Sequence, residues 1–336
     1  MKVLICEEPG RLAVIERPEP QPQPGEVLVR IRRIGVCGTD FHIFQGKHPF
    51  LSYPRVMGHE LSGTVETAPP ESGLSAGQSV YIVPYLACGR CLACRRGLTN
   101  ACQHIAVLGV HRDGGMGELL CVPAANVVPA GEASLDQAAM IEFLAIGAHG
   151  IKRGAVTARD RVLVVGTGPI GMAAIIFAKA RGAMVAAMDR RQDRLAFTVE
   201  ALGADHALAA DEAAEARLRE QTEGDGFDVV VDATGNAASI ERGFGFLAHG
   251  GRYVLLSVVR DNIAFADPEL HKREATLLAS RNAQPDDFAE VVAQMAAGRV
   301  PCTALNTHRG SLRDGPHLLP DWLRPEAGVI KAILEV

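Results

Sequence analysis

Four cysteines, Cys88, Cys91, Cys94 and Cys102, follow one another with the spacing C-x2-C-x2-C-x7-C. One short loop with this spacing can direct four sulfurs at one centre and complete a closed tetrahedral zinc shell. A closed shell leaves no position for a substrate, so the pattern predicts a structural zinc. The alternatives are disulfide bonds or buried thiols without a function. Adjacent C-x2-C pairs are poorly placed to cross-link the chain, and a reducing compartment disfavours disulfide bonds.

A second group of metal-ligand types surrounds Cys37, in Gly35-Val36-Cys37-Gly38-Thr39-Asp40, and Gly58-His59-Glu60. Thiolate, imidazole and carboxylate can give Zn²⁺ three protein bonds and leave a fourth position open. This is the pattern of a catalytic metal. Taken alone, a buried thiol and a hydrogen-bonded histidine would be the better explanation, but the other motifs of the chain favour a metal. We expect Cys37 to lie in a glycine-flanked turn after a strand at Glu26 to Arg32.

A glycine-rich loop, Gly166-Thr167-Gly168-Pro169-Ile170-Gly171, joins an apolar strand, Arg161 to Val165, to an apolar helix, Met172 to Arg181. The first glycine permits a tight turn, the second a close approach of a pyrophosphate, and the third close helix–strand packing. A second strand, Met184 to Met188, ends in Asp189, 23 residues after Gly166. This spacing predicts a dinucleotide site in which the carboxylate binds the adenosine ribose.

The choice of dinucleotide depends on the charges around Asp189. A carboxylate there repels a 2′-phosphate and favours NAD over NADP. Arg190, Arg191 and Arg194 work against this choice, because guanidinium groups would suit a 2′-phosphate. We take Asp189 as decisive and predict NAD, with NADP as the alternative.

The bulk properties narrow the class of protein. A chain of 336 residues suits two domains, and a net charge of −5 argues against a nucleic-acid partner. The four-cysteine stretch is also not followed by a basic recognition helix. The N-terminus has too short an apolar run for a signal peptide and no stretch approaches the length of a membrane span, so we expect a cytoplasmic protein.

The composition and the pattern of predicted elements change near Asp136. Residues 1 to about 130 are rich in Val, Gly and Pro with frequent turns, which predicts a β-rich domain. Strands and helices then alternate, which predicts a doubly wound parallel sheet. Besides those above, the expected elements are Gln137 to Ile151, Arg190 to Leu202, a surface helix at Ala209 to Glu220, Asp228 to Asp232, Ala238 to Phe246, Gly251 to Leu256, Thr276 to Ser280, Asp286 to Gly298 and a terminal strand at Val329 to Leu334 that returns to the first domain.

These elements, in this order, resemble those of the zinc-dependent medium-chain dehydrogenases, the family of alcohol, sorbitol and threonine dehydrogenases. The resemblance covers essentially the whole chain and is carried by Gly35 to Asp40, Gly58 to Glu60, the four cysteines, Ile141 to Ala145 and Gly166 to Gly171. Within the family the chain looks most similar to bacterial sugar-acid dehydrogenases of the L-galactonate type. The sequence segments that support this narrower similarity are Tyr53 to Glu60, Val107 to Gly115, Asp232 to Asn236 and Ser280 to Ala283.

The resemblance implies a GroES-like catalytic domain over residues 1–145 and 285–336, with a zinc lobe at about 84–104, and a Rossmann domain over 146–284. It implies two zinc ions per subunit, one structural and one catalytic. The catalytic zinc would bind Cys37, His59 and either Glu60, Glu142 or the two in exchange, with water filling any gap. Glu60 could instead be the buried partner of an arginine, and Glu142 could instead hydrogen-bond the zinc-bound water. It also implies cofactor contacts from Gly166, Gly168, Pro169, Ile170, Gly171, Asp189, Arg190 and Arg194.

The implied reaction is oxidation of a secondary alcohol to a ketone, with hydride transfer to NAD⁺ and a proton relay through Thr39 and His42. Asp40 would orient His59 or cap the turn. His111, Arg281 and Asn282 would line the substrate site, where a cation would pair with a sugar-acid carboxylate. The alternatives are a polyol or L-threonine dehydrogenase and a non-catalytic sensor that binds zinc and NAD. A homo-oligomer, dimer or tetramer, is expected, with Gly251 to Leu256 as a strand that could pair across a two-fold axis.

Overall fold

The computed structural model describes residues 1–47 and 51–336, and the chain divides into two compact units. The first unit contains Met1–Glu142, Val292–Ala297 and Cys302–Val336, and the second contains Phe143–Val291 and Gly298–Pro301. The domain bounds given by the resemblance stay a prediction. The two units differ from the predicted domains in assigning residues 143–145, 285–291 and 298–301 to the second unit. Among the described residues, no helix is both long enough and apolar enough to span a bilayer.

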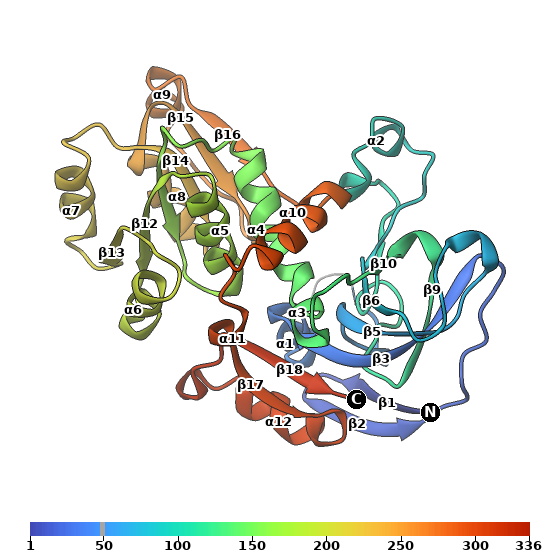
Figure 1. The fold of residues 1–336 in the computed structure, drawn as a ribbon. Coiled ribbons are helices and arrows are strands. Elements are labelled where there is room, and N and C mark those ends of the chain that lie inside the picture. The colour runs from blue at the N-terminus through green and yellow to red at the C-terminus, as the bar shows by residue number, and fades with distance from the viewer. Residues whose placement is uncertain (48–50) are drawn as a thin grey trace. The chain divides into compact units, whose positions relative to one another are not determined.

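The first unit is built on a sheet with the strand path β10-β6-β5-β3-β18-β17, and β9 also pairs with β3. A separate three-stranded sheet has the order β2-β1-β4, and β7 pairs with β8 alone (Figure 1). The strands are β1 (Lys2–Glu8), β2 (Arg11–Glu16), β3 (Glu26–Val36), β4 (Arg55–Val56), β5 (Glu60–Thr67), β6 (Ser79–Ile82), β7 (Tyr85–Leu86), β8 (Ala106–Val107), β9 (Leu119–Pro123), β10 (Val127–Pro129), β17 (Asn306–Ser311) and β18 (Lys331–Glu335). The helices are α1 (Gly38–Phe44), α2 (Leu92–Arg95), α3 (Leu135–Ala138), α11 (Cys302–Leu305) and α12 (Gly315–Trp322).

Strand β3 is the centre of this unit. Its side chains alternate, with Val27, Val29 and Ile31 fully buried, as a strand with one face on a core requires. β5 and β18 pair antiparallel with it on either side. The predicted return of the chain terminus to the first domain is therefore confirmed, because β18 supplies one of these neighbours.

The second unit contains a six-stranded sheet with the order β13-β12-β11-β14-β15-β16, and all its pairs are parallel. This confirms the predicted doubly wound fold class. The strands are β11 (Arg161–Val165), β12 (Met184–Asp189), β13 (His206–Ala209), β14 (Phe227–Asp232), β15 (Leu247–Leu255) and β16 (Thr276–Ala279). The helices are α5 (Pro169–Ala180), α6 (Gln192–Glu200), α7 (Ala214–Gln221), α8 (Ala237–Gly243) and α9 (Asp267–Lys272), while α4 (Ile141–Arg153) and α10 (Pro285–Ala296) each have residues in both units.

Two predicted helices were wrong. The stretch Ala209 to Glu220 is not one helix, because its first residue ends β13 and α7 begins only at Ala214. Gln137 to Ile151 is interrupted, since α3 ends at Ala138 and α4 begins at Ile141. The strand predicted at Gly251 to Leu256 is confirmed as part of β15, which ends at Leu255. Because β15 pairs with β14 on one side and β16 on the other, its suggested pairing across a two-fold axis is excluded.

Candidate functional site

The four cysteines lie on one excursion of the chain, residues 87–105, which joins the paired strands β7 and β8. We call this excursion the four-cysteine lobe. Cys91 caps the N-terminus of α2, Cys94 lies within that short helix, and Cys102 follows a single 3-10 turn. Figure 1 shows α2 projecting from the sheet of its unit, and most residues of the lobe are exposed. The local turns, rather than a hydrophobic core, bring the cysteines together.

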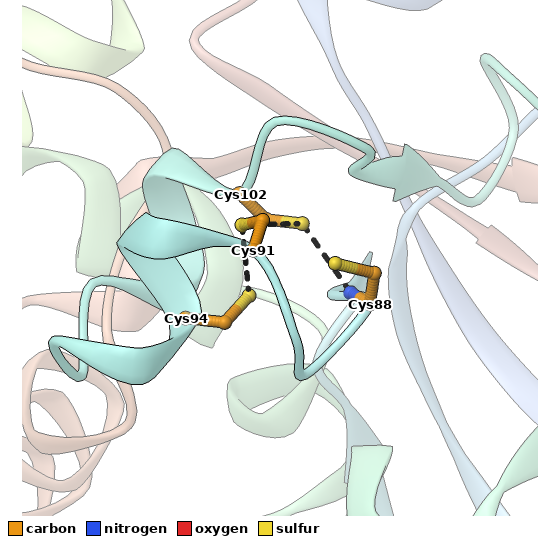
Figure 2. Close-up of side chains that lie close together, drawn as sticks. All are labelled: Cys88, Cys91, Cys94 and Cys102. Atoms are coloured by element: carbon orange, nitrogen blue, oxygen red, sulfur yellow. Dashed lines mark hydrogen bonds between the residues drawn. The ribbon is translucent and has the colours of Figure 1, made fainter.

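The sulfur atoms of these cysteines have the spacing of a zinc site. All four lie within 4.8 Å of one another, with 3.5 Å between Cys91 Sγ and Cys94 Sγ and 3.9 Å between Cys91 Sγ and Cys102 Sγ (Figure 2). A tetrahedral shell with Zn–S bonds of about 2.3 Å places its sulfurs about 3.8 Å apart. All four thiols are free of disulfides. The donor set and its dimensions therefore fit a structural zinc.

Backbone N–H groups donate hydrogen bonds to some of these sulfurs. The N–H groups of Cys88 and His104 each donate to Cys102 Sγ at 3.3 Å. Hydrogen bonds from the backbone of Cys94 and then Gln103 lower the pKa of Cys91 to about 6, whereas burial raises the pKa of Cys94 to about 12. A thiolate near neutral pH is the form that binds zinc.

A second cluster of metal-ligand types lies in the first unit. Cys37 directly precedes α1, which occupies the place of the predicted turn, and Glu60 is the first residue of β5. His59 follows Gly58, whose φ of +90° is the left-handed conformation that favours glycine. One ligand atom from each of Cys37, His59 and Glu60 lies within 4.8 Å of the others. The fold thus brings together the residues that the sequence predicts to bind one metal ion.

Asp40 connects the two backbone segments that carry Cys37 and His59. Its carboxylate accepts hydrogen bonds from Cys37 N at 2.9 Å and Gly58 N at 3.2 Å, and its side chain is fully buried. These bonds agree with the turn-capping alternative rather than with a direct hydrogen bond to His59. Asp40 therefore fixes the cluster through the main chain.

Glu60 is held by a lysine, not by the arginine that the sequence suggested. Lys331 Nζ, on β18, lies 2.7 Å from both carboxylate oxygens of Glu60, and both side chains are fully buried. Gly35 makes room for this pair, because a Cβ atom there would lie 2.1 Å from Glu60 Oε2. Burial would lower the pKa of Lys331, but the charges of Glu60 and Cys37 raise it. Both oxygens of Glu60 are thus engaged in an ion pair.

Glu142, near the start of α4, has a different environment. The hydroxyl of Tyr85 donates to Glu142 Oε1, while Glu142 Oε2 is buried without a hydrogen-bond partner. Burial raises the pKa of this carboxyl, and the nearby charge of His59 opposes the rise. A buried carboxylate oxygen without a partner is costly unless a cation completes it.

The buried cluster, by which we mean Cys37, His59, Glu60 and Glu142, has the donor types of a divalent-cation site. The ligand atoms of Cys37, His59 and Glu60 lie within 4.8 Å of one another, and Glu142 lies close enough for its charge to act on His59. Burial would lower the pKa of His59, but the charges of Cys37, Asp40 and Glu142 raise it well above its ordinary value. His59 Nδ1, like Glu142 Oε2, is buried without a partner among the described residues. A metal ion would complete these two atoms and supply positive charge in place of a proton on His59.

Thr39 and His42 both lie on α1, three residues apart and therefore on one side of the helix. Thr39 is half-buried beside Cys37 in sequence, whereas His42 is exposed. The helix thus leads from the buried cluster toward solvent.

The glycine-rich loop in the second unit has the predicted geometry. Gly166 has a φ of +88°, and a Cβ atom on Gly171 would lie 1.8 Å from the carbonyl oxygen of Gly166. Gly168 caps α5, which begins with Pro169 and Ile170. Asp189 ends β12 beside this loop, and its carboxylate accepts hydrogen bonds from Thr167 N at 2.6 Å and Thr167 Oγ1 at 2.8 Å. Its predicted bond to a ribose stays a prediction.

The remaining predicted residues are spread over both units. Arg194 Nη1 donates to Thr167 O at 3.2 Å, whereas Arg190 is exposed. His111 is exposed in the first unit, where its Nδ1 accepts a hydrogen bond from Val107 N at 3.1 Å. Arg281 and the half-buried Asn282 belong to the second unit. Their role in substrate binding stays a prediction.

Sequence reasoning missed two residues of the buried cluster's surroundings, Lys331 and Tyr85. Lys331 had a signal, since it is a lone charge in the apolar run Val329 to Leu334. Tyr85 had none, because its partner is 57 positions away.

The fold and these two clusters define a class of protein, and comparison with known families agrees. The alcohol dehydrogenase GroES-like domain matches residues 23–132, and the zinc-binding dehydrogenase domain matches residues 169–297. The chain belongs to the zinc-type alcohol dehydrogenase family and is an oxidoreductase.

Individual relatives share most of the chain. L-galactonate-5-dehydrogenase of Escherichia coli K12 is 42% identical over 92% of this chain and 91% of its own. A sorbitol dehydrogenase of Halalkalibacterium halodurans is 31% identical over 94% of each chain. The crystal structure of the Escherichia coli CFT073 alcohol dehydrogenase rspB, complexed with NADH, has a TM-score of 0.93 at 30% identity and covers 100% of this chain and 99% of its own.

Proposed function

We propose that the chain oxidises a secondary alcohol of a sugar acid, an aldonate similar to L-galactonate, to the keto acid with NAD⁺. The observation that carries the chemistry is the buried cluster, whose atoms Glu142 Oε2 and His59 Nδ1 have no partner among the described residues. The substrate class is supported by the 42% identity to L-galactonate-5-dehydrogenase.

Cys37, His59 and Glu142 would hold the catalytic zinc. Glu60 is the less suitable ligand, because Lys331 already engages both of its oxygens. Bound at this site, zinc would supply Lewis acidity toward the substrate oxygen, and NAD⁺ would accept the hydride. Thr39 Oγ1 would take the proton of the alcohol, and the exposed ring of His42 would pass it to water.

The cofactor preference follows from Asp189. Its carboxylate stands where an adenosine ribose would bind and would repel a 2′-phosphate, so we propose NAD rather than NADP. The similar structures include one complexed with NADH and one bound to NADP, so this proposal is carried by Asp189. His111, Arg281 and Asn282 would contact the substrate. A cytoplasmic location and assembly into a dimer or tetramer remain predictions.

The test is NADH formation by the zinc-loaded protein with L-galactonate, other hexonates, sorbitol and L-threonine. Cys37→Ser should abolish turnover, whereas Cys121→Ser, a half-buried thiol on β9 outside both clusters, should leave it unchanged. Turnover confined to aldonates supports the proposal. Turnover of sorbitol or L-threonine alone would overturn the substrate class, and no turnover by protein with two bound zincs would favour a non-catalytic sensor.

A further inference from the structure

The backbone of Tyr85 is fixed on both sides. Tyr85 pairs with Val107 in the two-stranded ribbon formed by β7 and β8. Asn126 Nδ2 donates to the carbonyl oxygens of Val83 at 2.8 Å and Tyr85 at 3.2 Å. Leu108 N donates to Pro84 O at 3.1 Å. These hydrogen bonds fix the backbone of Tyr85 and therefore the point from which its side chain extends.

The β7–β8 ribbon is closed by the four-cysteine lobe. Each strand of the ribbon has only two residues, which is too short to be stable alone. The lobe joins the two strands, and the hydrogen bond from Cys88 N to Cys102 Sγ ties its first and last cysteines together. A metal ion bound by all four cysteines would shorten the closed loop further. It would thereby reduce the conformational entropy that the ribbon could gain by opening. The lobe thus supports the strand that carries Tyr85.

The side chain of Tyr85 reaches the other cluster. It is 7% exposed, and its hydroxyl donates to Glu142 Oε1. That bond uses one oxygen of Glu142 and leaves Oε2 as the buried oxygen without a partner. A hydrogen bond to one oxygen restricts the rotation of the carboxylate and thereby limits where its second oxygen can lie. Phenylalanine would fill nearly the same volume but could not do this.

We propose that Tyr85 is a positioning residue through which the four-cysteine lobe orients Glu142 for zinc binding in the buried cluster. The inference rests on the proposed role of Glu142 as a zinc ligand. Tyr85 contacts neither the metal nor the substrate in this arrangement, and acts through the carboxylate. Loss of such a supporting hydrogen bond typically weakens metal binding or activity by about 10- to 100-fold.

The experiment compares Tyr85→Phe with Tyr253→Phe in the full-length protein. Tyr253 is the matched control, because its buried hydroxyl also donates one hydrogen bond, to Ile240 O at 2.9 Å, but lies in the second unit. The readouts are zinc affinity by chelator competition and the visible spectrum after cobalt replacement, which distinguishes a four-thiolate site from a one-thiolate site. Tyr85→Phe should bind the buried metal about 10- to 100-fold more weakly and retain the lobe metal. Tyr253→Phe should match the wild type.

Two outcomes would contradict, respectively, the role of Tyr85 and the proposed catalytic metal site. If the wild type binds two zincs and Tyr85→Phe binds both equally well, Tyr85 does not position Glu142. If the wild type binds only the lobe zinc, the proposed catalytic site itself is wrong.

A second variant tests the connection to the lobe. Cys94→Ser should weaken the buried metal in the wild-type background but add little in the Tyr85→Phe background, because the link is already broken. Equal weakening in both backgrounds would show that the lobe acts by another route. Should Cys94→Ser fail to fold, the affinities of Tyr85→Phe and Tyr253→Phe still decide whether Tyr85 positions Glu142.

Discussion

The four cysteines of the lobe lie on one short, mostly exposed segment, whereas Cys37, His59, Glu60 and Glu142 come from separate elements of the first unit and adjoin its core. In the lobe, neighbouring backbone N–H groups stabilise the sulfur charges. In the buried cluster, a distant lysine, a distant tyrosine and a glycine without a side chain set the geometry. The comparison teaches that the geometry of a local site is set within the segment that carries its ligands, while that of a buried site also depends on residues from distant parts of the chain.

Removal of one thiol from each cluster tests this contrast most strongly. Cys37→Ser should lower kcat/KM by about a thousandfold or more, because Lewis-acid stabilisation contributes several kcal/mol to the barrier. Cys91→Ser should lose the lobe zinc and lower the melting temperature, yet keep turnover when zinc is supplied in excess. Metal content, melting curves and NADH formation measure both variants. Equal losses of turnover under excess zinc would remove the distinction between a structural and a catalytic cluster.

The buried ion pair offers the next largest effect. Lys331→Met leaves Glu60 as a buried charge without a partner and should cost about 3–5 kcal/mol of unfolding free energy in urea. Lys331→Met combined with Glu60→Gln should recover most of that loss, since no uncompensated charge remains.

An exposed pair provides the control for this measurement. Lys272 and Glu269 form an ion pair on α9 with about half of each side chain exposed. Lys272→Met should leave the urea midpoint unchanged. A loss as large as that of Lys331→Met would show that burial is not what makes the Glu60 pair important.

Two glycines, one in each region, sharpen the comparison with smaller effects. Gly35→Ala places a Cβ atom 2.1 Å from Glu60 Oε2 and should cost about 1–3 kcal/mol through overpacking. Gly89, in the lobe, has a φ of +71° but no atom near its missing Cβ, so Gly89→Ala should cost about 1 kcal/mol through backbone conformation alone. Urea unfolding of both variants shows which substitution costs more stability. Only Gly35→Ala should also weaken metal binding at the buried cluster. The reverse order would contradict the view that side-chain crowding governs the buried cluster.

The same contrast explains how much could be predicted from the sequence. The lobe is visible in the spacing of four cysteines, and the glycine-rich loop is visible because a strand, a turn and a helix follow one another directly. Lys331 is 271 positions from Glu60, and no local pattern connects them. β15 was considered able to pair across a two-fold axis because a strand's own residues do not reveal that β16 continues the ladder beyond it. Pairing between distant segments is a property of packing, so it could be found only in the folded chain.

The pairing of Leu86 with Ala106 has an evolutionary consequence. These two residues hold the ends of the four-cysteine lobe one strand spacing apart, about 5 Å. A lineage could therefore lengthen the lobe, or replace it by a tight turn, without shifting the sheet of the first unit. Descendants that lost the cysteines would need another means of holding the ribbon closed, because the position of Tyr85 depends on that closure.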